Sequence, residues 1–430
     1  MSSRARAHFD RFLAVAVPVA GLLEATSIIN LGETTGVPLA AATVPVLLLR
    51  LAYDWAALVR LWNTDRSFRL WTRTLAVFLG CLWIGGGIHA LGFSLNPSSQ
   101  LSQCVSRSTW PIYLTAAYAF YRVTKREQTL LRAIIGFGTV YVLYGFYDLI
   151  AQGVGLPRFL DWLRNNHSIY VSRTVGGWTG LPRISSLAGE PAFTTVPIMV
   201  FIAGAVLGLR GWWRASALTL CLLFVIGTAA RSLWLVVVAT LVTVLAAIIW
   251  RRITTVRFRC AVERPLLLMF GAALPIALLM ARLSIDATDS DYSVQERQEG
   301  TQVGYEIFQA EPVFGRGFEA KNIYYRSYSN HLLNYENIPS EIHNGFASYL
   351  SSLGIIGYIL FEIPIILVIL AQGLKTEWRV YWIMVIVMCM QAGDFSWTTS
   401  FWAMLLFVAL QPYLMQNLSH NAIERRIRAV

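Results

Sequence analysis

Two arginines and a histidine have the residue types and settings of a site that handles an anion and a proton. Arg231 lies where two apolar segments meet with almost no polar linker between them. A guanidinium is planar and permanently charged, which suits a phosphate group. If the second segment is a helix that begins at Ser232, its free N–H groups would add to an anion site. The alternative for Arg231 is an anchor that extends its charge to a membrane interface.

The other two candidates lie in or beside a long polar segment, residues 284–342. Arg297 falls in a predicted short helix, where it either binds an anion or pairs with a neighbouring Glu in solvent. His343 stands where the chain turns apolar again, ahead of a helical apolar stripe. A neutral imidazole can accept a proton near pH 7. A histidine that only caps the helix is the alternative.

Two further stretches border these candidates. Pro312-x-x-Gly315-x-Gly317-Phe318 predicts a tight glycine turn, and on its own indicates no more than a loop corner. Glu190 precedes Pro191, which would open a helix. Its carboxylate either stabilises the positive end of the helix dipole, or contacts a sugar hydroxyl, or orients the catalytic groups.

The elements that must position these residues are predicted to be membrane spans. The chain is 56% hydrophobic and 14% charged, against roughly 25% charged in soluble domains. Its apolar runs are near the length needed to cross a bilayer. The predicted fold class is all-α: a polytopic membrane protein of about twelve transmembrane helices, with a large, partly helical periplasmic loop between spans nine and ten. The spans are 11–31, 37–59, 71–93, 109–123, 130–152, 191–209, 215–230, 232–250, 265–283, 343–371, 380–394 and 397–416.

The sequence therefore divides into six predicted segments. Spans one to five occupy residues 1–152 and a first periplasmic loop 153–190. Spans six to nine occupy 191–283, the large periplasmic loop 284–342, and spans ten to twelve 343–416. A basic cytoplasmic tail, 417–430, follows.

Positive charge sets the predicted orientation. With the N-terminus in the cytoplasm, every inside segment is basic and both termini are cytoplasmic. The net charge of +11 is therefore a topology signal and a contact with anionic lipid, and no nucleic-acid partner is expected. Eleven basic residues fall in the predicted outer segments, and all of them except Lys321 are Arg. This preference for Arg over Lys indicates a phosphate-bearing substrate. Within span two, Arg50 is expected to pair with Asp54 four residues later, with Glu24 as a third member.

Other site classes are disfavoured. The five cysteines are scattered, and no pair has metal-ligand spacing. We expect no metal and no cofactor; Asp289-Ser290-Asp291 is the one pair with suitable spacing.

In order and spacing, Arg297, the Pro312–Phe318 motif, His343-Asn344 and Gly354-x-x-Gly357 resemble the core of the O-antigen ligase and O-antigen polymerase superfamily. Arg231 resembles the family's Arg at the tip of a helical hairpin. The resemblance covers roughly residues 179–357. It implies a bacterial inner-membrane glycosyltransferase whose active site faces the periplasm.

The resemblance also implies substrates and roles. The donor is a glycan on undecaprenyl pyrophosphate, and the acceptor is a lipid-linked glycan or lipid A-core. Arg231 and Arg297 would bind the pyrophosphate, and His343 would activate the acceptor hydroxyl. Membrane lipids are further partners, and a chain-length regulator is a candidate partner. The remaining candidates for glycan contacts are Arg183, Glu190, Arg316 and Asn344.

Three functions stay open at this point. The stretch from Arg183 to Phe193, with Gly-Glu-Pro before a span, favours a polymerase of O-antigen or exopolysaccharide. An O-antigen ligase is the alternative. A transporter or flippase is the second alternative, because membrane-embedded charges also occur in carriers; no six-span repeat or paired broken helices support it.

Overall fold

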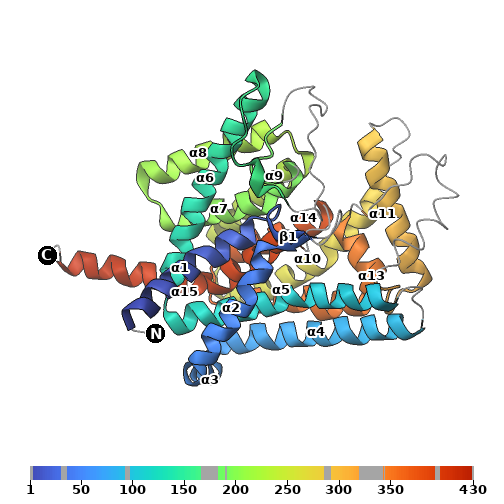
Figure 1. Cartoon of the computed structure of the whole chain (residues 1–430), viewed down its shortest axis with the longest axis horizontal. Coiled ribbons are helices and arrows are strands. Elements are labelled where there is room, and N and C mark those ends of the chain that lie inside the picture. The colour runs from blue at the N-terminus through green and yellow to red at the C-terminus, as the bar shows by residue number, and fades with distance from the viewer. Residues whose placement is uncertain are drawn as a thin grey trace. The chain divides into compact units, whose positions relative to one another are not determined.

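The structure is a computed structural model that describes residues 3–30, 36–92, 97–165, 183–188, 191–284, 292–318, 342, 344–392 and 398–428. Apart from a two-stranded antiparallel sheet, β1 (Ser27–Asn30) with β2 (Gly36–Pro38), its regular elements are helices (Figure 1). The predicted all-α class is confirmed. The helices are α1 Ser3–Leu22, α2 Leu39–Tyr53, α3 Trp55–Thr64, α4 Arg66–Gly92, α5 Pro97–Thr124, α6 Glu127–Val154, η1 Asp161–Leu163, η2 Pro191–Thr194, α7 Thr195–Gly208, α8 Gly211–Thr228, α9 Arg231–Ile253, α10 Val256–Leu283, α11 Tyr292–Ala310, α13 Gly345–Ala371, α14 Thr376–Ala392 and α15 Thr399–Arg428.

Eight of the described helices are long and apolar enough to cross a membrane, and α2 with α3 makes a ninth if this bent pair counts as one span. The protein is thus a multi-pass membrane protein. Among the described residues, the expected number of about twelve is not reached by this criterion. The predicted span 109–123 is the end of the longer helix α5, which starts at Pro97.

The first predicted span, 11–31, is wrong at its end. Helix α1 stops at Leu22, and β1 follows. The strand is held by the loop after α6: the Ser27 N–H donates to Asn165 Oδ1 (2.8 Å), and the Thr26 hydroxyl donates to the Leu163 carbonyl (2.5 Å). These long-range bonds outweigh the helical pattern of the apolar residues.

The second predicted span, 37–59, is broken at Asp54, where α2 and α3 meet at 90°. The predicted pair is confirmed: Arg50 Nη1 donates to Asp54 Oδ2 at 2.7 Å. Arg50 also makes two bonds to Asp10 (2.6 and 2.9 Å), and Arg6 pairs with Asp54. Asp10 and Arg6 therefore complete this buried network. Glu24 instead accepts a hydrogen bond from Ser400.

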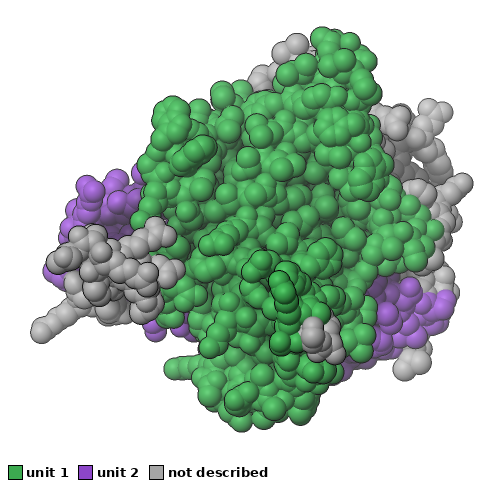
Figure 2. Space-filling view, turned by 60° about the vertical axis from the view of Figure 1, so that its left-hand side comes forward, with its two compact units in different colours: residues 1–68, 112–238, 398–430 green, residues 69–111, 239–397 purple. Residues whose placement is uncertain are grey.

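The chain forms two compact units, coloured in Figure 2. Unit 1 comprises residues 1–68, 112–238 and 398–430, and unit 2 comprises 69–111 and 239–397. In unit 1, α6, α7, α8 and the start of α9 pack around a core that includes the fully buried Tyr141, Phe224 and Leu233, and α1 and α15 each pack against α6. In unit 2, α13 packs against α10, α11 and α14. There, Phe78 of α4 lies 4.3 Å from Phe361 of α13 between ring centroids.

Candidate active site

In unit 1, Arg231 is the first residue of α9, at the tip of the predicted hairpin. Helix α8 ends at Thr228, and Ala229 then takes a left-handed conformation (φ 45°) that reverses the chain within two residues. Ala230 is buried, whereas Arg231 is exposed. The Arg231 side chain makes no hydrogen bond or ion pair with any residue that the structure describes. The first N–H groups of α9 also lack partners within the helix, so this tip can accept an anion.

A second arginine fixes this tip. Arg183 Nε donates to the Thr228 carbonyl (3.1 Å), and Arg183 Nη2 donates to the Ala229 carbonyl (3.4 Å). The next residue, Ile184, donates its N–H to Gly227 O at 3.1 Å. Arg183 thereby satisfies carbonyls at the C-terminus of α8, where a positive charge is favourable. The predicted glycan contact of Arg183 stays a prediction; the observed contact is with the hairpin tip.

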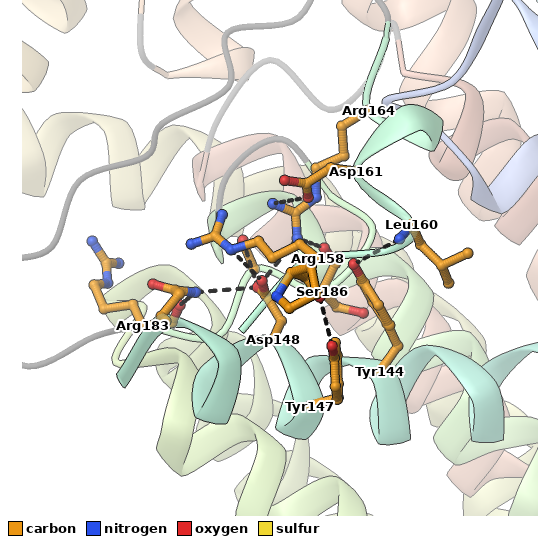
Figure 3. Close-up of polar contacts among 12 residues, drawn as sticks. Tyr144, Tyr147, Asp148, Arg158, Leu160, Asp161, Arg164, Arg183 and Ser186 are labelled. Carbon is orange, nitrogen blue, oxygen red and sulfur yellow. Dashed lines mark hydrogen bonds and ion pairs between the residues drawn. The ribbon is translucent and has the colours of Figure 1, made fainter. Parts of the chain in front are cut away.

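Asp148 of α6 anchors the segment that carries Arg183 (Figure 3). Its carboxylate is fully buried and pairs with Arg158 Nε (3.2 Å) and Arg164 Nη2 (3.1 Å). It also accepts the Ser185 hydroxyl at 3.4 Å. Figure 3 shows the Arg183 side chain extending away from Asp148. Arg158, Arg164 and Arg183 are therefore all engaged with the protein itself, which sets Arg231 apart.

Further bonds hold the same segment to α6. Arg164 donates to the Ser186 carbonyl, and the Ser186 hydroxyl donates to Tyr141 O at 2.6 Å. Gln152 Nε2 donates both to Asp148 and to the Arg183 carbonyl (3.2 and 3.3 Å). Residues 183–188 thus form a rigid strap between α6 and the α8–α9 tip.

In unit 2, the glycine motif closes a break in α13. Gly354 has φ 65° and ψ −166°, so the helix is interrupted there. The carbonyls of Ser351 and Ser352, at the end of the first half, accept the N–H groups of Arg316 (2.7 Å) and Gly317 (3.0 Å). On the other side of the break, the N–H groups of Ile355 and Ile356 donate to the Pro312 and Val313 carbonyls at 2.9 and 3.2 Å. The loop therefore satisfies backbone groups on both sides of the break.

Backbone contact this close explains Gly354 and Gly315, and the Gln100 side chain lies comparably close to Gly317. A Cβ on Gly354 would lie 2.3 Å from Val313 O, and one on Gly315 would lie 2.6 Å from Ser352 C. Gly315 and Gly317 also have positive φ values, 69° and 77°, a region that other residues rarely enter. The predicted glycine turn is confirmed, and its partner is the broken helix.

Side chains of both charge signs and neutral polar side chains surround this junction. The Arg316 guanidinium pairs with Glu311 at 3.0 Å, and the Arg107 guanidinium lies 3.9 Å above the Phe318 ring. His89 Nε2 is 3.4 Å from the Phe314 carbonyl. Gln100 Oε1 accepts the Phe318 N–H at 3.1 Å. His89, Gln100 and Arg107 belong to α4 and α5. No role was predicted for His89 or Gln100, which no local motif marks, and Arg107 was counted only among the outer-side basic residues.

Asn344 caps the first half of α13. Its Oδ1 accepts the Ala347 N–H at 2.9 Å, and its Nδ2 donates to Gln391 Oε1 at 2.9 Å. Gln391 Nε2 in turn donates to the Pro275 carbonyl. Asn344 is fully buried, and these hydrogen bonds tie α10, α13 and α14 together. A glycan contact by Asn344 stays a prediction.

The remaining predicted site residues are partly or wholly outside the described structure. His343 and Glu190 lie outside the described residues. Arg297 falls within α11, which confirms the predicted helix in the large loop, but its side chain is not among those described. Helix α11 packs on α13 through buried Val303 and Ile307. In the described part of the chain, no three His, Cys, Asp or Glu side chains are grouped to bind a metal ion.

Residues 216–361 match the family model described as O-antigen ligase. This segment is a domain of the O-antigen ligase and polymerase superfamily. The O-antigen ligase domain runs from α8 through the broken part of α13, so it contains Arg231, Arg297, Arg316, His343 and Asn344. Arg183 and Asp148 lie outside the matched O-antigen ligase domain. No curated protein and no solved structure gave a significant match to the chain.

Proposed function

We propose that the protein transfers a glycan from undecaprenyl pyrophosphate to a hydroxyl of an acceptor at the periplasmic face of the bacterial inner membrane. The observation that carries this proposal is the exposed Arg231 guanidinium at the start of α9, within the O-antigen ligase domain. Neighbouring arginines are engaged with Asp148 or with carbonyls. Arg231 is therefore available for the pyrophosphate, with Arg297 as its expected second ligand.

The reaction is a substitution at the anomeric carbon. The acceptor oxygen forms a bond to that carbon, and the bond from the carbon to the pyrophosphate oxygen breaks. His343 takes the hydroxyl proton, and undecaprenyl pyrophosphate leaves. Arg231 and Arg297 would stabilise the negative charge that grows on the leaving group. The donor is already activated, so the proposal involves no nucleotide or metal ion.

The acceptor separates the two candidate activities. The Gly189-Glu190-Pro191 stretch favours a polymerase, whose acceptor is a second lipid-linked repeat unit. The matched family's description, O-antigen ligase, favours transfer to lipid A-core. We propose the polymerase of O-antigen or exopolysaccharide and keep the ligase as the second candidate.

The surface glycan of a strain that lacks the protein distinguishes these activities on a gel. Loss of the long ladder, with core carrying one repeat retained, identifies a polymerase. Loss of all attached glycan, with polymer accumulating on undecaprenyl pyrophosphate, identifies a ligase. An unchanged profile, with unchanged exopolysaccharide, would contradict both.

Complementation with variants then tests the site. Arg231→Ala and His343→Ala should each abolish glycan transfer at normal membrane abundance. Arg210→Ala, which removes an exposed arginine at the other end of α8, is the matched control and should complement fully. Arg297→Lys separates charge from geometry: loss of activity would indicate that the guanidinium fork is needed. Wild-type transfer by Arg231→Ala or His343→Ala would refute the site.

A further inference from the structure

Helix α3 leaves most of its surface uncovered. Leu61 is the one buried residue among its ten. Trp55, Val59 and Trp62 are 65%, 41% and 37% exposed. At about 100° per residue, these three side chains lie within about 60° of one another around the helix and together form the α3 apolar face. Arg60, which is also exposed, lies about 140° away from Trp55. Helix α3 is therefore amphipathic, with an apolar face that the described chain leaves largely exposed.

The helices before and after α3 place it at a membrane surface. Helix α2 ends at Tyr53, and α3 leaves it at 90° (Figure 1). Helix α4 starts at Arg66 and is long and apolar enough to cross a membrane. One residue, Asp65, separates α3 from α4, and its Oδ1 accepts the Phe68 N–H at 3.0 Å. Because α3 ends where a membrane span begins, it lies at the level of the lipid headgroups.

Ion pairs hold the bend between α2 and α3. Arg50, in the last turn of α2, donates to Asp10 at 2.6 and 2.9 Å. It also donates at 2.7 Å to Asp54, the residue between the two helices. Arg6 pairs with the same Asp54 carboxylate. With the bend fixed in this way, α3 does not continue α2 through the bilayer and instead runs across its direction.

A helix of this size needs a further contact. An isolated helix shorter than about 12–15 residues is marginal in water, and α3 buries one side chain against the protein. A bilayer surface supplies what is missing, because it takes up the apolar face of an amphipathic helix and is the preferred environment of tryptophan. Arg60 and Arg66 are both exposed, and long arginine side chains extend their charge to the headgroups. A tryptophan face flanked by two cations is complementary to an anionic phospholipid.

We infer that α3 is an in-plane helix that binds anionic phospholipid at one surface of the bilayer, which by the predicted topology is the cytoplasmic one. The α3 apolar face lies among the upper acyl carbons, and Arg60 and Arg66 contact headgroup phosphates. The occupant is lipid rather than a protein partner, because a helix at headgroup depth is surrounded by lipid already. The inference does not depend on the proposed glycan transfer.

Photo-crosslinking tests the position of α3. The full-length protein is placed in nanodiscs of phosphatidylcholine and phosphatidylglycerol, with a photo-crosslinking residue at Trp55, Trp62 or Thr64. Thr64 is the matched control, because it is exposed on the opposite side of the helix from Trp55. Positions 55 and 62 should label phospholipid strongly, and position 64 should label it weakly. Equal labelling from all three positions, or no labelling, would overturn the inference.

The depth of the labelled atoms gives a second criterion. Trp55 and Trp62 are about 10 Å apart along the helix axis. An in-plane helix should label acyl carbons at the same depth from both positions, as located by fragment mass spectrometry. A helix that enters the bilayer would label different depths from the two positions, and that result would refute the in-plane orientation.

Headgroup charge is tested with the double variant Arg60→Gln, Arg66→Gln. From position 62, the otherwise unchanged protein should label phosphatidylglycerol about fivefold above its share of the lipid. The double variant should label it close to its share. Arg210→Gln, at another exposed arginine of a predicted cytoplasmic segment, is the matched control and should keep the preference. An unchanged preference in the double variant would overturn the assignment of anionic lipid to α3.

Discussion

Replacing Arg183 should impair the protein through Arg231. Arg183→Gln removes both bonds to the α8–α9 tip, at 3.1 and 3.4 Å. A hydrogen bond that involves a charged group contributes about 1.5–3 kcal/mol, and the longer of these two bonds is weak. We therefore expect Arg183→Gln to reduce the free energy that holds the tip in its observed position by about 2 kcal/mol. At about 1.4 kcal/mol per factor of ten, kcat/KM for glycan transfer should fall roughly 30-fold.

A double-mutant cycle with Arg231→Ala tests this reasoning. If Arg183 acts only by holding the tip, Arg183→Gln should not lower kcat/KM further in a protein that already carries Arg231→Ala. The coupling free energy between the two substitutions should then be about 2 kcal/mol. The assay measures residual transfer at high enzyme concentration, or donor binding when transfer is too slow. Arg158→Gln is the matched control, because Arg158 binds Asp148 and does not touch the tip. Its effect should add to that of Arg231→Ala.

Additive effects of Arg183→Gln and Arg231→Ala would refute the positioning role. They would indicate that Arg183 touches a substrate itself, as the sequence suggested. Arg183→Lys gives a second criterion. A lysine keeps the charge but cannot reach two carbonyls with a planar fork, so a positioning role predicts incomplete rescue.

Two further variants test the supports of the site. Asp148→Asn removes the buried carboxylate that Arg158 and Arg164 share and leaves Arg164 with only its longer pair to Asp161, at 3.5 Å. It should destabilise the protein by about 3 kcal/mol, seen as a lower thermal unfolding midpoint in detergent; an unchanged midpoint would show that the Asp148 pairs are not important for stability. Gly354→Ala places a Cβ 2.3 Å from a carbonyl at positive φ, and should abolish transfer or folding, whereas Gly373→Ala, with open space around it, should be silent in the same complementation assay. Full activity of Gly354→Ala would mean that the loop can leave the α13 break without consequence.

Local patterns in the sequence were enough to predict several parts of the site. The charged tip at Arg231, the helix around Arg297 and the glycine turn at Gly315 all follow from short-range spacing. Each of these three parts depends on a backbone preference or an apolar periodicity that residues close together in the sequence determine.

The contacts that hold these parts in place could not be read in the same way. Asp148 is one acidic residue in an apolar run, and only the fold brings Arg158 and Arg164 to it. Backbone hydrogen bonds join the Gly315 loop to the α13 break. Because every residue type except proline can make such bonds, the sequence does not reveal which segments they connect. At the 90° bend, Asp54 pairs with Arg6, and Arg50 pairs with Asp10; no spacing rule connects these distant residues to the bend.

The interleaving of the two units has a consequence for how the chain is made. Unit 1 needs α15, which comes after all of unit 2 in the chain: Thr399 donates to the Gly21 carbonyl (2.8 Å) and Ser400 donates to Glu24 (2.7 Å). Unit 2 begins at residue 69, and it is complete only when residues 239–397 have been made. Neither unit can close while its early helices are being inserted, so these helices must remain in the bilayer with their polar groups unmatched. The Gly21 carbonyl and the Glu24 carboxylate therefore find their partners only after α15 has been made, late in the assembly of unit 1.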